Sequence, residues 1–147
     1  MHIMKSIKLL GLILLSFTLL NTQCEEDDVY VASCDLSVIV DNEVYNTIES
    51  DDYTLNDYYF IGDCLKIIID ASGCDTSNWE MTLVDSENIG ESIPHQRFLK
   101  LSVITNQACQ VVFSKTVSFD VKSLRLPGVN EVVLNIEGFN ESILYSY

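Results

Sequence analysis

The sequence predicts an all-β protein, an antiparallel, immunoglobulin-like β-sandwich of about eight strands. Short stretches rich in β-branched and aromatic residues recur along the chain, and clusters of Gly, Asn, Asp and Ser separate them at intervals of about 8–12 residues. After the first two dozen residues no segment has a convincing 3.6-residue hydrophobic period. A closed β-barrel is the alternative, because it also buries one face of alternating strands.

Several of the expected strands alternate apolar with polar residues, which is typical of antiparallel strands with one buried face. In the clearest case Trp79, Met81 and Leu83 share one face. Ten stretches are candidates for these strands: residues 35–40, 43–48, 58–62, 64–72, 79–85, 97–105, 109–115, 116–122, 131–138 and 142–147. The turn pair Asp41-Asn42 predicts a hairpin between the first two. Residues 49–57 are polar and turn-rich, and residues 86–96 are expected to form a loop.

The first 23 residues predict an export signal, which we expect to be helical. Their only charges are Lys5 and Lys8, and residues 9–20 contain none. A basic start, an apolar run and a polar exit are the layout of a secretory signal. A helix that spans a membrane needs about 20 apolar residues, so an uncleaved anchor is the less favoured alternative.

Cys24 directly follows this segment, and the junction resembles a bacterial lipoprotein signal. Leu20, Thr22 and Cys24 match that pattern, whereas Gln23 stands where the family prefers Gly, Ala or Ser. The resemblance implies that the chain is cut before Cys24 and that this cysteine carries acyl chains such as palmitate. Residues 31–34 fit the same pattern, but using them would draw four carboxylates into the membrane-embedded peptidase, which is costly.

The acidic run at residues 25–28 resembles the export signals of surface lipoproteins from Bacteroidota. This resemblance implies an outer-membrane lipoprotein of the cell envelope that faces the medium. The run would also serve as a solvated tether, because a short charged segment cannot bury itself. We therefore divide the chain into a signal peptide (1–23), an acidic tether (24–33) and a β-sandwich domain (34–147).

The charge balance excludes some partners. Removal of residues 1–23 leaves 124 residues, six of them basic and 22 acidic, for a formal net charge of −16. Nucleic acid and anionic lipid head groups are poor partners for such a chain, because their binding depends on basic side chains. We expect no nucleic-acid ligand, and contact with the membrane through the N-terminal lipid.

Four cysteines remain once Cys24 is assigned to lipid: Cys34, Cys64, Cys74 and Cys109. An even number in an exported chain predicts two disulfides. Three pairings are possible and the sequence cannot choose among them; we favour Cys64 with Cys74 and Cys34 with Cys109. A zinc site is the alternative, but it would lack any CxxC pair and a nearby histidine.

The sequence offers little catalytic chemistry, and we expect no enzyme. It contains no GxSxG, HExxH or Gly-rich phosphate motif. His95, the only histidine after the signal, lies in an expected loop. Acids that could pair for glycoside hydrolysis are more simply solvated side chains: Glu49, Asp51, Asp52, Asp57, Asp63, Asp70 and Asp75. We expect no cofactor, with calcium at residues 49–52 and 70–78 as a weaker alternative.

Aromatic and loop residues are the candidates for binding. Tyr53, Tyr58, Tyr59 and Phe60 cluster, and alternation would turn some of them outward, where tyrosine favours binding a sugar or a peptide. The candidate binding residues are Tyr58, Tyr59, His95 and Arg97. The loop that holds His95 could instead present itself to a protease.

The body of the chain resembles small, uncharacterised lipoproteins of marine flavobacteria. The stretches that carry the resemblance are GDCLKIIIDASGCD, WEMTLVDS, PHQRFLKL, ACQVVFSKTVSFDV and the final ILYSY. It implies no known activity. We therefore expect a non-catalytic binding or structural module with an unknown protein or glycan ligand, and the alternative is a protease inhibitor or small hydrolase on the same scaffold.

Overall fold

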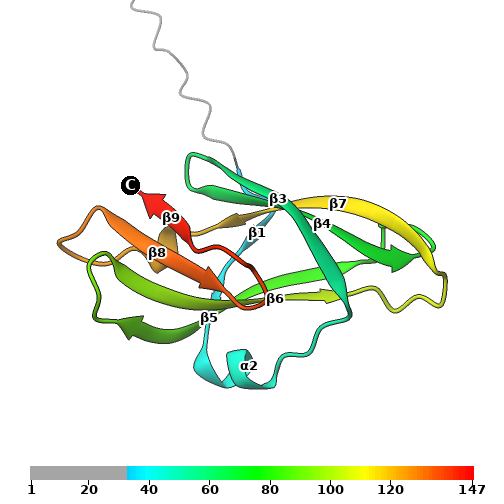
Figure 1. Ribbon diagram of the computed structural model, residues 1–147, viewed down its shortest axis with the longest axis horizontal. Coiled ribbons are helices and arrows are strands. Elements are labelled where there is room, and N and C mark those ends of the chain that lie inside the picture. The colour runs from blue at the N-terminus through cyan, green and yellow to red at the C-terminus, as the bar shows by residue number, and fades with distance from the viewer. Residues whose placement is uncertain (1–32) are drawn as a thin grey trace, which may run out of the picture. The chain divides into compact units, whose positions relative to one another are not determined.

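Two β-sheets form the body of the protein (Figure 1), as a computed structural model shows. The structure describes residues 33–147. The expected signal peptide, its cleavage site, Cys24 and most of the tether lie outside the described residues. The sheets are open and separate, so the predicted sandwich is confirmed and the closed barrel is wrong. No helix within residues 33–147 is long and apolar enough to cross a membrane.

The first sheet has the strand order β1-β7-β4-β3. Its strands are β1 (Leu36–Ser37), β7 (Val111–Asp120), β4 (Cys64–Gly73) and β3 (Tyr53–Ile61). The second sheet has the order β2-β5-β6-β8-β9. Its strands are β2 (Ile39–Val40), β5 (Glu80–Gly90), β6 (His95–Ile104), β8 (Glu131–Ile136) and β9 (Ile143–Ser146).

Alternation had predicted antiparallel strands throughout, but both sheets also contain parallel pairs. The pairs β3–β4, β4–β7, β5–β6 and β8–β9 are antiparallel. The pairs β1–β7, β2–β5 and β6–β8 are parallel. Alternation reports only that one face of a strand is buried, and it carries no information about the direction of the neighbouring strand.

The core lies between the sheets and consists of the residues that alternate inward. Trp79, Met81 and Leu83 are all buried, as predicted. The same alternation places Leu99, Leu101 and Val103 of β6, Val117 and Phe119 of β7, and Val132, Leu134 and Ile136 of β8 in the core. A 3-10 turn, η1 (Lys122–Leu124), adds the buried Leu124.

A short helix replaces the second strand of the predicted hairpin. Helix α2 (Asn42–Thr47) begins at Asp41, whose Oδ1 accepts hydrogen bonds from the amides of Glu43 (2.8 Å) and Val44 (2.9 Å). A capping aspartate of this kind stabilises a helix start, and the same residue is also common in turns. The first expected strand is divided as well, because β1 pairs with the first sheet and β2 with the second.

Several strands extend into residues that were predicted to be loops or turns. Residues 53–57 are strand, although they are polar. The two strands expected over residues 109–122 form the single strand β7. β5 continues to Gly90 through a bulge in which residues 86–88 stand opposite Phe98, and Glu87 has a positive φ of 62°. Sheet pairing thus extends strands into polar sequence whose composition resembles that of a loop.

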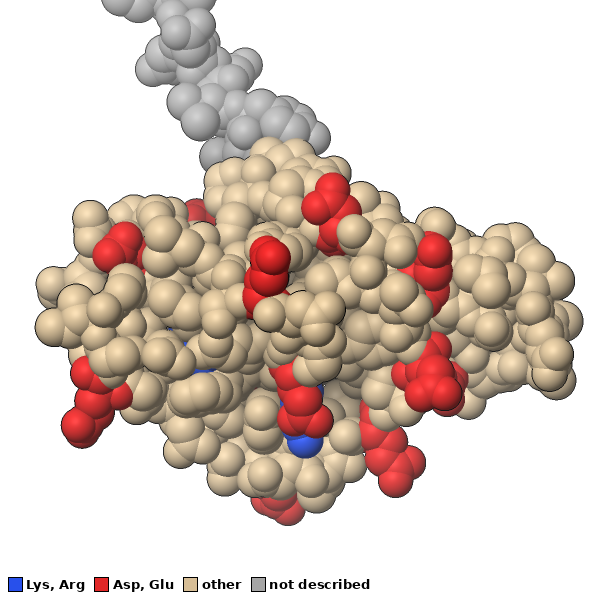
Figure 2. Space-filling model, viewed as in Figure 1, with Lys and Arg blue, Asp and Glu red and all other residues tan. Residues whose placement is uncertain are grey.

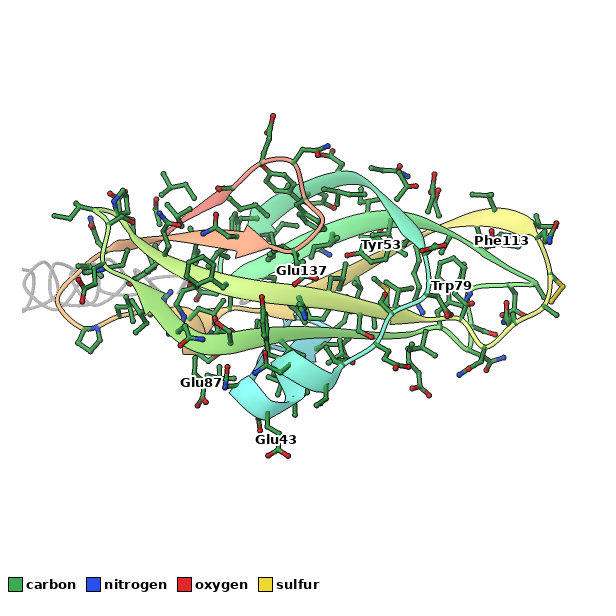
Figure 3. All side chains as sticks on the ribbon, turned by 60° about the horizontal axis from the view of Figure 1, so that its bottom comes forward. Glu43, Tyr53, Trp79, Glu87, Phe113 and Glu137 are labelled. Carbon is green, nitrogen blue, oxygen red and sulfur yellow. A yellow bond between two sulfur atoms is a disulfide. The ribbon has the colours of Figure 1, made fainter. Side chains whose placement is uncertain are left out.

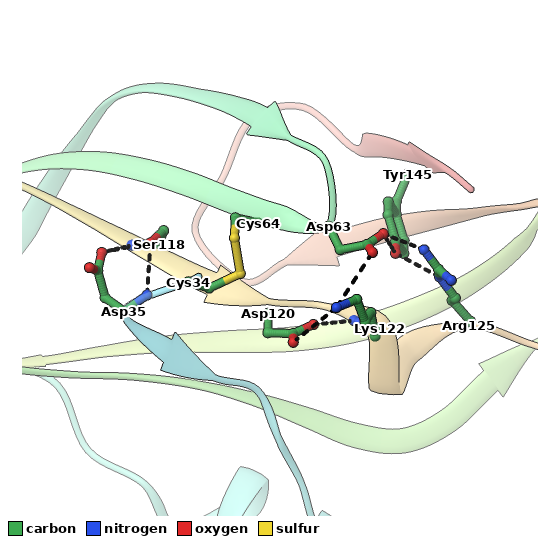
Figure 4. The surroundings of a disulfide bond; sticks show 9 residues. All are labelled: Cys34, Asp35, Asp63, Cys64, Ser118, Asp120, Lys122, Arg125 and Tyr145. Atoms are coloured by element: carbon green, nitrogen blue, oxygen red, sulfur yellow. Dashed lines mark hydrogen bonds and ion pairs between the residues drawn. A yellow bond between two sulfur atoms is a disulfide. The ribbon is translucent and has the colours of Figure 1, made fainter. Parts of the chain in front are cut away.

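All four cysteines of residues 33–147 form disulfides, as expected, but the favoured pairing is wrong. Cys34 bonds to Cys64, and Cys74 bonds to Cys109. Cys64 begins β4 and Cys74 directly follows it. Ten strand residues span roughly 30 Å, whereas bonded cysteines have Cα atoms about 4.4–6.8 Å apart. Figure 4 shows the first disulfide at the end of the sandwich where β4 begins.

Candidate ligand-binding site

The segment that crosses from helix α2 to β3, residues 48–53, forms the centre of the candidate site. β8 pairs with β6 only as far as Leu99, so the rest of that edge of β6 is free for another partner. The crossing segment takes this place: the Asp51 amide donates to the Val103 carbonyl (2.8 Å), and the Ser102 hydroxyl donates to the Glu49 carbonyl (2.6 Å). The site therefore rests on a rigid strand edge.

Two hollows open on either side of this segment. One, of about 360 Å³, is lined by residues 48–53, residues 100–102, Glu137 and Gly138. The other, of about 710 Å³, is lined by residues 51–52, Ser72 and residues 105–110. Asp51 and Asp52 line both hollows. We call the two hollows together the trough.

Lys100 provides a cation in the smaller hollow. Its ammonium lies 3.4 Å from a carboxylate oxygen of Glu137 and 4.7 Å from the ring centroid of Tyr45 on helix α2. The Lys100 side chain is only 25 % exposed, whereas that of Glu137 is 63 % exposed. Glu137 can therefore turn towards solvent, and Lys100 would remain as a positioned donor for a ligand.

Tyr53 supplies an aromatic wall to the same hollow. Its hydroxyl donates to the Leu101 carbonyl (3.3 Å), and burial raises the pKa of the phenol. Tyr53 and Glu137 both line the hollow and lie close together in Figure 3. An aromatic face beside hydroxyl, amide and carboxylate groups suits a polar ligand that also has apolar faces, such as a sugar.

Asp51 is a structural acceptor in the trough. Its Oδ2 accepts hydrogen bonds from the Thr105 amide (2.7 Å) and the Thr105 hydroxyl (3.0 Å). These bonds favour the ionised form, so they lower the pKa of Asp51 below its usual value. A general acid in glycoside hydrolysis needs a raised pKa, so Asp51 is unsuited to that role.

The loop acids considered for calcium are engaged separately in the described part of the chain. Asp75 accepts from the Ser77 amide (2.8 Å), and Asp70 accepts from the Ser114 hydroxyl. Within residues 33–147 no group of three or more His, Cys, Asp or Glu side chains could hold a metal ion.

The four sequence-predicted binding residues do not converge. Tyr58 packs against the core, while Tyr59 points outward from the first sheet and is 43 % exposed. His95 is half-buried at the start of β6, with Nδ1 3.3 Å from the Gly90 carbonyl. Arg97 is buried and pairs with Asp85. Arg97 was expected in an accessible position, and alternation along β6 instead directs it inward.

The expected protease-facing loop is also much shorter than predicted. Residues 86–90 belong to β5 and residue 95 begins β6, which leaves residues 91–94. Ile93 in this turn is 95 % exposed and precedes a cis proline, Pro94. The side-chain Nε2 of Gln96 donates to the Ser92 hydroxyl (2.8 Å), which in turn donates to the Pro94 carbonyl (2.9 Å).

Sequence reasoning missed Lys100, Tyr45 and Glu137 as partners. They come from β6, helix α2 and the position just after β8, so no linear motif joins them. Only Tyr53 and the acids of residues 49–52 had been singled out, for other reasons. Acidic side chains are scattered over the face shown in Figure 2 and do not mark the trough.

Comparison with known proteins identifies the fold alone. No protein-family model matches the sequence, and no curated protein matches it. One solved structure is similar, a protein of unknown function, DUF1344, from Bacteroides vulgatus ATCC 8482. It shares 15 % identity with a TM-score of 0.53, over 76 % of this chain and 56 % of that chain. The described chain thus spans just over half of that protein.

Proposed function

We propose that this protein is an exported lipoprotein of the cell envelope whose β-sandwich binds a glycan in the trough and catalyses no reaction. The observation that carries the export part of the proposal is that all four cysteines of residues 33–147 are disulfide-bonded. Disulfides are typical of proteins outside the cytoplasm. Cys24 is then the fifth cysteine, with no cysteine left to pair with it in the body.

The disulfides also support Cys24 over Cys34 as the lipidated residue. A lipidated cysteine of this kind carries its diacylglyceryl group on sulfur, and the sulfur of Cys34 is bonded to Cys64. The apolar run and the acidic residues that follow Cys24 support export to the outer membrane by the resemblance described above.

Mass spectrometry of the intact protein from native membranes tests the anchor. We expect a chain that begins at residue 24, carries acyl chains and lacks four hydrogens because of its two disulfides. Cys24→Ala should release the protein from the membrane fraction, whereas Ser33→Ala, a change outside the proposed cleavage junction at residues 20–24, should not. A membrane-bound chain that retains residues 1–23 would contradict the proposal.

The trough supports a glycan as the ligand. It combines a partly buried ammonium, the Tyr53 ring, and the amide side chains of Asn106 and Gln107. Sugars use such mixed sites, because their hydroxyls need donors and acceptors while their C–H faces pack on rings.

Affinity electrophoresis against a panel of soluble polysaccharides tests the ligand. We expect retardation by at least one glycan and its loss in Lys100→Met. Lys66→Met is the matched control, because Lys66 lies on the other sheet outside the trough. Equal retardation of both variants would place binding elsewhere, and turnover of a glycan would refute the non-catalytic assignment.

A protease inhibitor is the second candidate, favoured by the almost complete exposure of Ile93 in its short turn. Inhibitors present such a residue to the specificity pocket of the protease. Inhibition that is lost in Ile93→Asp but kept in Val129→Asp, an exposed residue in another turn, would favour this function over glycan binding.

A further inference from the structure

Strand β7 has one edge that is largely unpaired within residues 33–147. β4 pairs with β7 along its whole length, but on the other side β1 reaches only Phe119 and Asp120. The next position is capped by a side chain, because the amide of Ser118 donates to Asp35 Oδ2 (2.9 Å). Residues 111–117 therefore form an open edge, which we call the β7 edge.

The direction of the backbone groups on the β7 edge follows from the two capped positions. The Asp120 carbonyl accepts from the Val38 amide (3.3 Å), and the Ser118 amide donates to Asp35. The backbone N–H and C=O groups of even-numbered β7 residues therefore point away from β4. Backbone groups alternate along a strand, so Val112, Ser114 and Thr116 also direct their N–H and C=O groups outward. Such a row of unpaired groups is a template for another strand.

The charges along the β7 edge indicate which kind of strand could pair with it. Residues 111–117 include no acid, in a chain with 22 acids. Their only charge, Lys115, turns towards the segment between β4 and β5 and donates to the carbonyls of Thr76 (2.9 Å) and Trp79 (3.1 Å). The end of the domain at which β7 begins shows no charged side chain on the face drawn in Figure 2.

Two of the other open edges carry acids, and the third, the edge strand β9 (Ile143–Ser146), is only four residues long. Asp57 lies within β3, and Glu80 begins β5. Two copies of this acidic chain would bring the carboxylates of β3 or β5 together at those edges. Residues 111–117 contribute no carboxylate of their own, and Asp70 on the neighbouring strand β4 is engaged by the Ser114 hydroxyl. Val111 and Val112 are 57 % and 63 % exposed, so pairing there would also bury apolar surface.

We propose that two copies of the chain associate by antiparallel pairing of their β7 edges. The Asp35 cap and the start of β7 limit the pairing to residues 111–117, whose midpoint is Ser114. Ser114 then faces Ser114 of the second copy, and Val112 faces Thr116. The two four-stranded sheets become one continuous sheet, related by a two-fold axis perpendicular to it.

This symmetry is compatible with two chains anchored in one membrane. Cys64 alternates with the core-facing Leu65 and therefore lies on the outer face of the first sheet, where it holds Cys34. A two-fold axis perpendicular to the sheet keeps this face of both copies on the same side. Only this compatibility rests on the proposed anchor; the pairing itself does not.

Disulfide trapping tests the register. Directly opposed residues in a hydrogen-bonded antiparallel pair have Cα atoms about 5.5 Å apart, within the disulfide range. In membranes that contain full-length Ser114→Cys, we expect a band of twice the monomer mass that disappears on reduction. Ser146→Cys, at the edge strand β9, is the matched control and should give no more dimer than the wild type. Equal trapping at both positions would reflect random collision and overturn the proposal.

Sedimentation of the purified full-length protein in detergent tests the association without a new cysteine. We expect a wild-type dimer, and Ser114→Glu should raise its dissociation constant at least about tenfold, because it sets two carboxylates opposite each other. Ser146→Glu should leave it unchanged. A monomeric wild type, or trapping of a different protein by Ser114→Cys, would overturn self-association. Cys24→Ala should still form dimers, so failure of the anchor and failure of the pairing are distinguishable.

Discussion

Arg97 and Asp85 form an ion pair inside the sandwich, with Arg97 Nη2 2.9 Å from Asp85 Oδ1. Their side chains are 7 % and 0 % exposed, and Asp85 Oδ2 and Arg97 Nε have no hydrogen-bond partner among residues 33–147. Burial raises the pKa of Asp85, and Arg97 opposes that shift. Asp85 and Ile89 flank the bulge in β5, and Ile89 stands opposite Arg97, so the pair connects the two ends of the bulge.

The bulge in turn positions helix α2. Glu87 has its positive φ within the bulge, and its carboxylate accepts a hydrogen bond from the Asn42 amide (3.3 Å). The Asp41 amide donates to the Asp85 carbonyl (3.1 Å). Tyr45 on this helix contacts Lys100. The Arg97–Asp85 pair therefore supports the trough indirectly, through the bulge and helix α2.

Removal of one partner of the buried pair should strongly destabilise the fold. We expect Arg97→Met to lower the free energy of unfolding by about 3–5 kcal/mol, because it leaves Asp85 buried without its cation. The double variant with Asp85→Leu should recover part of this loss. Urea denaturation monitored by Trp79 fluorescence measures both values.

Glu137→Gln provides the control for this measurement, because it removes an ion pair whose acid is mostly exposed. We expect a change of about 0–1 kcal/mol there. A loss in Arg97→Met no larger than in Glu137→Gln would show that the buried pair does not support the fold.

Each disulfide should stabilise the domain by a similar amount. The Cys34–Cys64 and Cys74–Cys109 bonds close loops with sequence separations of 30 and 35 residues. Loss of chain entropy in the unfolded state predicts about 3–4 kcal/mol for each. Paired replacements by Ser, one disulfide at a time, should show these losses in urea denaturation. Peptide mapping under non-reducing conditions checks the pairing, and a Cys64–Cys74 peptide would contradict the structure.

The sequence predicts those parts of the fold that depend on local pattern. Alternation identified the inward faces of β5, β6 and β8, because a residue's side of a strand is set by its position in the pleat. The helix at residues 42–47 was missed, because Asp41 suits a turn and a helix cap equally. The disulfide pairing and the trough were not predictable, since both depend on which distant strands become neighbours.

Stability should fall in acid because of Asp51. Its pKa is lowered in the folded state by the Thr105 hydrogen bonds, so the ionised form is favoured by folding. The resulting stability is present above the unfolded pKa, about 3.9, and is lost as the pH falls towards the folded value. Asp51→Asn should therefore weaken the dependence of the urea midpoint on pH below about pH 4.

Glu43→Gln is the control for this acid effect, because it changes an acid on helix α2 outside the hydrogen-bonded contact with Thr105. This variant retains the Thr105 hydrogen bonds to Asp51, so the acid sensitivity that they cause should remain. An Asp51→Asn profile that follows the wild type would exclude Asp51 as a source of acid sensitivity.

Tyr145 should show an unusual alkaline titration. Its hydroxyl donates to Asp63 Oδ1 (2.7 Å) and accepts from Arg125 Nε (2.9 Å), as Figure 4 shows. Burial, followed by the bond to Asp63, raises the pKa of Tyr145 to about 12. Absorbance at alkaline pH should therefore reveal a tyrosine that ionises near pH 12, and this component should be absent in Tyr145→Phe.

The same shift predicts how stability changes with alkaline pH. The folded pKa of Tyr145 lies above the unfolded value of about 10, so its contribution is complete below pH 10. Between about pH 10 and 12 the unfolded chain loses the proton first, and stability falls as the pH rises. Tyr145→Phe should lose this part of the alkaline dependence, whereas Tyr59→Phe, on the outer face of the first sheet, should keep it. If Tyr145→Phe retained the full dependence, the bond between Tyr145 and Asp63 would not control alkaline unfolding.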